Sequence, residues 1–173
     1  MLRLVYPFVG AKDSYRSLVA EINAAGEERV PFTLDYPHEN FAALVARLLG
    51  EARGIGIAPG WVPHSTYWLM EGDQVVGASS LRHRLTPKLR ISGGHIGYGI
   101  RPSARGRGLG TAILKLTLER AARIGIDSAL VTCADTNAAS AAVIFANGGE
   151  LEAREYNAER GEVMRRYWVP TPY

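Results

Sequence analysis

Apolar residues follow two different periods along this chain, and the two periods separate strands from helices. Short runs of alternating or continuous apolar residues predict strands, because successive side chains of a strand point to opposite faces. Apolar residues spaced three or four apart predict amphipathic helices. The strands are predicted at residues 2–6, 66–70, 74–81, 96–100, 129–133, 150–157 and 162–169. The helices are predicted at residues 13–25, 41–49, 109–123 and 138–146, and residues 82–94 form a long connection.

The most informative segment is the junction between the strand at 96–100 and the helix at 109–123. A loop with Gly106, Gly108 and Gly110 connects the two elements. Glycine allows a backbone to approach a ligand closely, and the first N–H groups of a helix have no intrahelical partner. Together these features predict a site for a pyrophosphate-like anion.

Three kinds of phosphate-binding loop compete for this segment. A Walker A loop needs a lysine after the glycines, and none follows here. A dinucleotide fingerprint that starts at Gly106 needs a sixth-place glycine, where Thr111 stands. The remaining pattern is R/Q-x-x-G-x-G/A, which Arg105, Gly108 and Gly110 match. A tight turn with solvated arginines is the alternative without a ligand.

The elements after the loop add to this pattern. The continuous apolar run at 129–133 predicts a buried strand parallel to the one before the loop. Asn137 is a predicted cap for the next helix, which ends at Asn147-Gly148-Gly149. In this order of elements and in the loop motif, residues 66–169 resemble the GNAT superfamily of N-acetyltransferases. The chain resembles in particular a bacterial branch of predicted acetyltransferases, with the ribosomal-protein N-terminal acetyltransferases as more distant relatives.

The resemblance implies an α/β (α+β) fold with a mixed, mostly antiparallel sheet of about seven strands, about four helices and a splayed central parallel strand pair. It implies one domain over 1–173, with substrate-side helices and loops in 1–65 and the cofactor-binding core and C-terminal hairpin in 66–169. It also implies direct acetyl transfer from acetyl-CoA to a primary amine in a ternary complex. The implied cofactor-binding residues are Tyr98, Gly99, Ile100, Arg105, Gly106, Arg107, Gly108, Leu109, Gly110, Thr111, Asn137 and Ser140.

The catalytic residues are less sharply indicated. His95 begins the strand at 96–100, and its imidazole is a candidate base for the amine, although a local hydrogen bond would also explain it. His83 and Glu71 are weaker candidates, whereas His38 and His64 are expected to face solvent. Many family members carry a tyrosine seven residues after the capping asparagine, where Ile144 stands here.

Ser140 is the predicted substitute for the role of this tyrosine. It follows Asn137 by three positions, and the ribosomal-protein relatives also carry a serine there. Its hydroxyl can donate a hydrogen bond to a leaving thiolate, or can bond back to a helix carbonyl.

Composition narrows the function further. The 173 residues are 47% hydrophobic and 21% charged, which is ordinary for a soluble globular protein. A net charge of +3 does not indicate nucleic acid, and its local concentration at Arg101, Arg105 and Arg107 fits an anionic cofactor. No apolar run is long enough for a membrane span or a signal peptide. The single Cys133 excludes an internal disulfide, predicts a cytoplasmic protein, and is more typical of a buried side chain than of a nucleophile.

Two other functions stay open on the sequence alone. One is a catalytically silent acyl-CoA-binding or sensing module of the same fold, and the other is a nucleotide-binding domain of a different fold. The acceptor can be a small-molecule amine, an amino acid or a peptide N-terminus. The C-terminal strand, with Tyr167 and Trp168, is predicted to lie at an exposed sheet edge and to pair in a homodimer.

Overall fold

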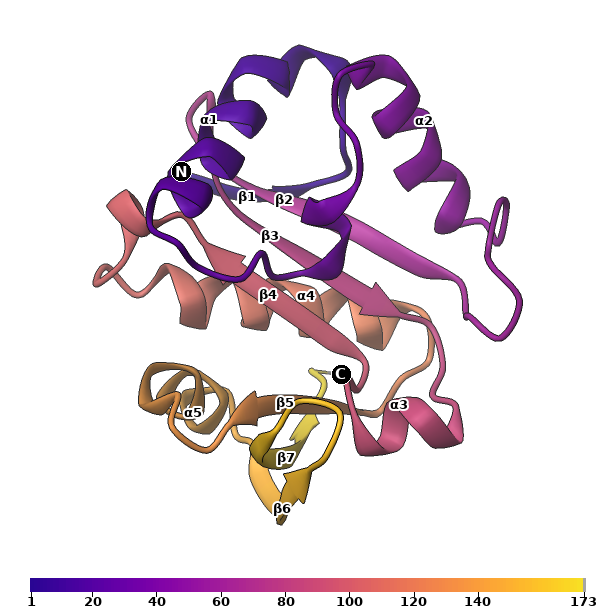
Figure 1. Cartoon of the computed structure of the whole chain (residues 1–173), viewed down its shortest axis with the longest axis vertical. Helices are drawn as coiled ribbons and strands as arrows, with labels where there is room; N and C mark the ends of the chain where they lie inside the picture. Colours follow the sequence, from indigo (N-terminus) through magenta and orange to yellow (C-terminus); the bar gives the residue numbers. More distant parts are fainter. Residues whose placement is uncertain (173) are drawn as a thin grey trace.

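A seven-stranded sheet runs through the computed structural model, which describes residues 1–172 (Figure 1). The strands are β1 (Leu2–Val5), β2 (His64–Glu71), β3 (Gln74–Arg82), β4 (Ile96–Ile100), β5 (Ser128–Ala134), β6 (Glu150–Asn157) and β7 (Glu162–Pro170). Their order across the sheet is β1-β2-β3-β4-β5-β7-β6. Neighbours are antiparallel except β4 and β5, which are parallel. The predicted mixed, mostly antiparallel sheet is confirmed.

Helices cover both faces of this sheet. They are α1 (Lys12–Ala24), α2 (Phe41–Glu51), α3 (Pro87–Ile91), α4 (Leu109–Arg123) and α5 (Ala138–Ala146). The successive β2 residues Trp68 and Leu69 are both fully buried, but they belong to different hydrophobic clusters. Trp68 packs with α1 and α2, whereas Leu69 packs with α4, because neighbouring side chains of a strand point to opposite faces. The sheet therefore separates an α1/α2 face from an α4 face.

Local signals define the two helices that flank β5. Gly108 precedes α4 with a left-handed φ of 77°, and Gly125 follows that helix with a φ of 84°. The Asn137 side chain accepts a hydrogen bond from the amide of Ser140 and so caps α5. Such start and stop residues act within one helical turn, which is why both helices have the predicted bounds.

The structure corrects two predictions. The connection at 82–94 contains α3, whose first turn is capped by Thr86 and has Pro87 at its start, so residues 1–172 contain five α-helices. The C-terminal strand β7 lies between β5 and β6 and is not an edge. Tyr167 is only 7% exposed, and Trp168 donates a hydrogen bond to Glu152 of β6. The predicted edge pairing through β7 is therefore wrong, because β6 covers that edge.

No helix within residues 1–172 combines the length and apolar character that crossing a bilayer requires.

Candidate active site

The glycine loop joins the end of β4 to the start of α4. Gly106 and Gly108 have φ angles of 76° and 77°, in the left-handed region that glycine adopts readily. No side chain caps α4, and its hydrogen bonds begin with the amide of Ala112, which donates to the Gly108 carbonyl. The amides of residues 109–111 therefore lack an intrahelical acceptor. At the positive end of a 15-residue helix, they form a site suited to a phosphate-like anion.

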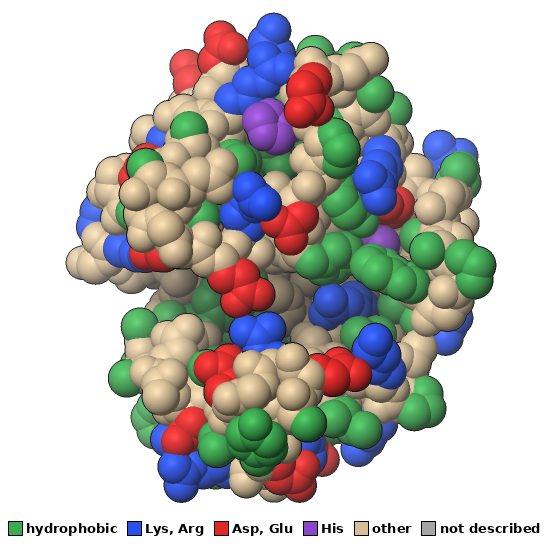
Figure 2. Space-filling model, in the orientation of Figure 1, with side chains coloured by type: hydrophobic (Ala, Val, Ile, Leu, Met, Phe, Trp, Pro, Cys, Tyr) green, Lys and Arg blue, Asp and Glu red, His purple; other side chains and the backbone are tan. Residues whose placement is uncertain are grey.

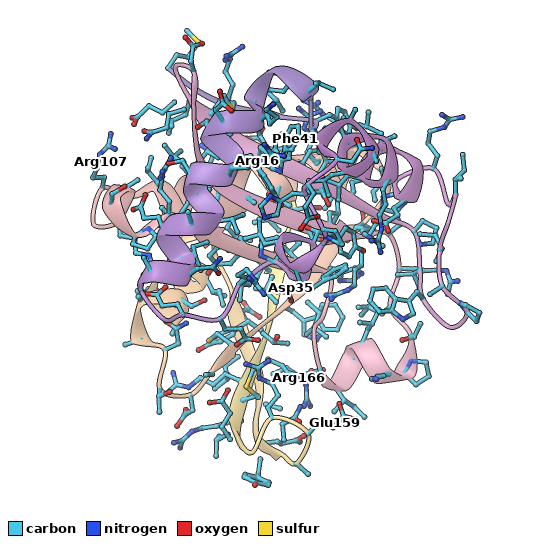
Figure 3. The ribbon with its side chains drawn as sticks, turned by 45° about the horizontal axis from the view of Figure 1, so that its top comes forward. Arg16, Asp35, Phe41, Arg107, Glu159 and Arg166 are labelled. Atoms are coloured by element: carbon cyan, nitrogen blue, oxygen red, sulfur yellow. The ribbon has the colours of Figure 1, made fainter. Side chains whose placement is uncertain are left out.

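The arginines near this loop are each paired with a carboxylate. The pairs are Arg101 with Glu21, Arg105 with Glu27, and Arg107 with Glu71. Arg101 is also buried, and Arg105 donates through Nε to the carbonyl of Ile100 at 3.1 Å, whereas Arg107 projects outward at the edge of the molecule (Figure 3). The local basic character that the sequence indicated here is therefore balanced by nearby carboxylates. The loop groups that remain free to bind an anion are the backbone amides of residues 109–111.

β4 and β5 separate shortly after they meet. Their register contains a single pair, Ile96 with Val131. On its other edge, β4 bonds to β3 through alternate residues, and the amide of Arg101 continues this series beyond the strand. Tyr98 and Ile100 alternate with the residues that bond to β3. Their amides therefore point the other way, toward the gap beside β5. A carbonyl oxygen in this gap would find N–H donors where negative charge develops.

Ser140 and Tyr98 face each other across this gap. The Ser140 hydroxyl lies 2.8 Å from the Tyr98 phenol oxygen, in a hydrogen bond that either group can donate. Burial raises the pKa of Tyr98 to about 12, so the phenol keeps its proton at neutral pH. Ile144, in the place of the family tyrosine, is fully buried in the core. The Tyr98 side chain was missed by the sequence analysis, because the residue appeared only as a backbone contact.

Cys133 lies beside this hydroxyl pair on β5. Its thiol is buried, and burial raises its pKa, so it is protonated at neutral pH. A protonated thiol is a weak nucleophile. The interpretation as a buried small side chain fits this environment.

His95 holds β4 against β5 at the start of the gap. Its Nδ1 accepts a hydrogen bond from the Leu130 amide at 2.9 Å, and its own amide donates to the Leu130 carbonyl at 2.7 Å. Burial, assisted by the charge of Arg82, lowers the pKa of His95 to about 4. The lone pair that would accept a proton is therefore already engaged. This geometry argues against the base role predicted from sequence and favours the local hydrogen bond.

The remaining base candidates are engaged elsewhere. His83 lies 2.8 Å from the Ser65 hydroxyl, and burial lowers its pKa. Glu71 is paired with Arg107 near the glycine loop. His38 is half-buried, and His64 is only 2% exposed, so the expectation that both face solvent is wrong.

His64 belongs to a buried cluster that the sequence analysis missed. Its Nε2 lies 2.8 Å from Glu51 Oε2, and its Nδ1 lies 2.9 Å from the Val62 carbonyl. Glu51 also accepts hydrogen bonds from Tyr36 and Arg47, both at 3.1 Å. The Glu51 carboxylate is therefore shared by three side chains, those of Tyr36, Arg47 and His64. The cluster ties the segment between α1 and α2 to the start of β2.

The α1/α2 face has a recess between its upper and lower halves (Figure 2). The upper wall is the segment at 27–37, and a side chain on Gly99 of β4 would collide with the carbonyl of Val30 in this segment. The lower wall is the β6–β7 hairpin, and Arg160 of that hairpin pairs with Glu28 at 3.2 Å. Figure 3 shows Asp35 on the upper segment and Arg166 on β7 below it. This recess opens on the side of the sheet opposite α4.

Comparison with known proteins supports a common fold. RimL, a ribosomal L7/L12 α-N-protein acetyltransferase in complex with coenzyme A, aligns with a TM-score of 0.73 at 21% identity over 98% of this chain and 93% of its own. An acetyltransferase from Salmonella typhimurium that modifies the N-terminal serine of L7/L12 aligns at 0.72 and 20%, over 99% and 95%. The microcin C7 self-immunity acetyltransferase MccE, in complex with acetyl-CoA and AMP, aligns at 0.71 and 15%, over 98% and 92%. No curated protein matches the sequence.

A family model settles the classification. The model of the acetyltransferase (GNAT) domain matches residues 13–150, which include all but the first residue of α1, the glycine loop and the whole of α5. The chain therefore belongs to the GNAT acetyltransferase family.

Proposed function

We propose that this protein transfers an acetyl group from acetyl-CoA to a primary amine by direct transfer in a ternary complex. The observation that carries the proposal is the presence of two sets of free amides on one strand–loop–helix unit, those of Tyr98 and Ile100 in the β4/β5 gap and those of residues 109–111 at the start of α4. This arrangement suits a ligand with a carbonyl at one end and a pyrophosphate at the other. Coenzyme A in the RimL structure and acetyl-CoA in the MccE structure support this choice.

Acetyl-CoA supplies an activated carbonyl and a thiolate leaving group. The neutral amine attacks the thioester carbon, a C–N bond forms and the C–S bond breaks. The nitrogen loses one proton and the departing sulfur gains one. The backbone amides of Tyr98 and Ile100 stabilise the developing oxyanion. Tyr98 donates a hydrogen bond to Ser140, and the Ser140 hydroxyl in turn donates a hydrogen bond to the departing sulfur.

Calorimetric titration with acetyl-CoA, with ATP and NAD as controls, tests the donor. Micromolar affinity for acetyl-CoA alone supports the proposal, and an amine screen with a free-thiol readout then tests turnover. Binding without turnover on any amine would favour a silent acyl-CoA-binding module. Binding of ATP in place of acetyl-CoA would overturn the cofactor assignment.

The hydroxyl pair leads to a prediction about coupling. We expect Tyr98→Phe and Ser140→Ala each to lower kcat about tenfold, since Ser140→Ala removes the hydrogen bond to the leaving sulfur and Tyr98→Phe removes the hydroxyl that orients Ser140. Because the two groups act as a unit, the double variant should lose little more than either single variant. Steady-state kinetics of all three variants measure this coupling. Tyr156→Phe, at an exposed residue of β6, is the control. Fully additive losses would contradict a shared role.

The geometry of His95 leads to a prediction about pH. With a pKa of about 4, His95 stays neutral from pH 5.5 to 8.5 and adds no inflection to the rate profile. We expect kcat/KM to rise about tenfold per pH unit until the acceptor amine reaches its own pKa, because only the neutral amine reacts. The His95→Gln variant should keep the shape of this profile. An inflection near pH 6.5 that disappears in His95→Gln would instead establish His95 as the base.

A further inference from the structure

Arg82 is a largely enclosed cation whose hydrogen bonds do not go to a carboxylate. It ends β3, and its Nη1 donates to the carbonyls of Gly93 and Gly94, each at 3.1 Å. Its Cζ lies 5.0 Å from the centroid of the Phe32 ring. Within residues 1–172, no acidic side chain forms an ion pair with it, and its Nε and Nη2 groups have no hydrogen-bond partner. These two donors keep some solvent-accessible surface, although the residue as a whole is half-buried.

The surroundings of Arg82 make this lack of a partner unusual. Burial lowers its pKa, which shows that the protein environment does not compensate the charge fully. Arginines of the two segments that border the recess do have carboxylate partners. These pairs are Arg29 with Asp35 at 2.6 Å, Arg160 with Glu28 at 3.2 Å, and Arg166 with Glu155 at 3.0 Å. A guanidinium with two adjacent free donors matches the planar geometry of a carboxylate.

The position of Arg82 relates it to the reaction centre. The Arg82 amide donates to the His95 carbonyl at 2.7 Å, so the two residues lie opposite each other. His95 precedes Tyr98 by three positions. At about 3.4 Å per residue, the two backbone positions are about 10 Å apart along β4. Phe32 belongs to the upper wall, in the same segment as Val30, which covers Gly99. Arg82 therefore lies beside the recess and within reach of a molecule whose amine approaches the β4/β5 gap.

We propose that Arg82 binds a carboxylate of the acceptor, so that the acceptor is a primary amine carrying a carboxylate within about 10 Å of its nitrogen. This inference rests on the proposed acetyl transfer. It narrows the acceptor class to amino acids and short peptides or their analogues, and it disfavours polyamines and other purely cationic amines. The Phe32 ring shields one side of the guanidinium, which strengthens the ion pair by excluding water.

Matched probes test this inference. Glycine, 4-aminobutyrate and 6-aminohexanoate, each with its own amide, are titrated into ¹⁵N-arginine-labelled protein saturated with coenzyme A. We expect at least one carboxylate to shift the Arg82 Nε–H resonance saturably, and to bind at least tenfold more tightly than its amide. The Arg82→Gln variant should lose this preference, while Arg84→Gln, an exposed arginine two residues away, should keep it.

Two outcomes would overturn the inference. One is that no carboxylate binds better than its amide, and the other is that Arg82→Gln keeps the full preference. Acetyl-CoA affinity is measured in the same samples and should be unchanged in Arg82→Gln, which also shows that the variant is folded. If the wild-type protein fails to bind acetyl-CoA, the proposed function fails. If it binds acetyl-CoA without carboxylate preference, only the acceptor class fails.

Discussion

Replacing Gly108 with glutamate is expected to raise the Kd for acetyl-CoA at least about 100-fold, which corresponds to about 2.7 kcal/mol. Two physical effects act in the same direction. The φ angle of 77° at Gly108 disfavours any side chain, so the variant strains the start of α4. The new carboxylate also lies next to the amides of residues 109–111, where it competes with a pyrophosphate and repels it. Calorimetric titration measures the loss directly.

Two further variants separate these effects. Gly108→Ala introduces the strain without the charge, and its affinity should fall between the wild type and Gly108→Glu. Gly125→Glu is the matched control, because Gly125 has a φ of 84° and no atom within 4 Å of an added Cβ. It lies about 25 Å away beyond the other end of α4, so acetyl-CoA affinity should be unaffected. Wild-type affinity in Gly108→Glu would show that the loop is not the phosphate site.

The glycine loop and the two helices around it could be predicted because their signals are local. Gly108, Asn137 and Gly148 each act on the backbone within about one helical turn, and their chemistry does not depend on distant partners. Local start signals alone were not enough to predict α3. Thr86 and Pro87 are start signals for α3, but a helix of only five residues has no periodic apolar pattern to accompany them.

The roles of individual side chains could not be predicted in this way, because they depend on partners far along the chain. Arg105 is paired with Glu27, and His95 accepts a hydrogen bond from Leu130. Tyr98 reaches Ser140 only because β4 and β5 diverge. A residue type and its spacing indicate which chemistry is available, while the tertiary fold decides which lone pair or proton is already in use.

The buried pair of Glu51 and His64 is the clearest case of this dependence, and it leads to the largest stability effect that we expect. Glu51→Gln should lower the free energy of unfolding by about 3 kcal/mol at pH 7, because it removes the buried carboxylate that His64, Arg47 and Tyr36 share as a hydrogen-bond partner. Chemical denaturation measures this loss. Glu155→Gln is the matched control, since the Glu155 side chain is 63% exposed in its pair with Arg166, and it should cost less than about 1 kcal/mol.

The difference between wild type and Glu51→Gln should also depend on pH in a defined direction. Burial by itself would raise the pKa of Glu51, but the hydrogen bonds from His64, Arg47 and Tyr36, together with the charge of His64, outweigh it and lower the pKa. A carboxylate with a lowered folded-state pKa stabilises the protein above its unfolded pKa, which is about 4.3, and loses this contribution as the pH falls further. We therefore expect the difference to shrink as the pH falls below about 4, where the carboxylate of the wild type becomes protonated. A difference that is independent of pH would mean that Glu51 acts through packing and not through its charge.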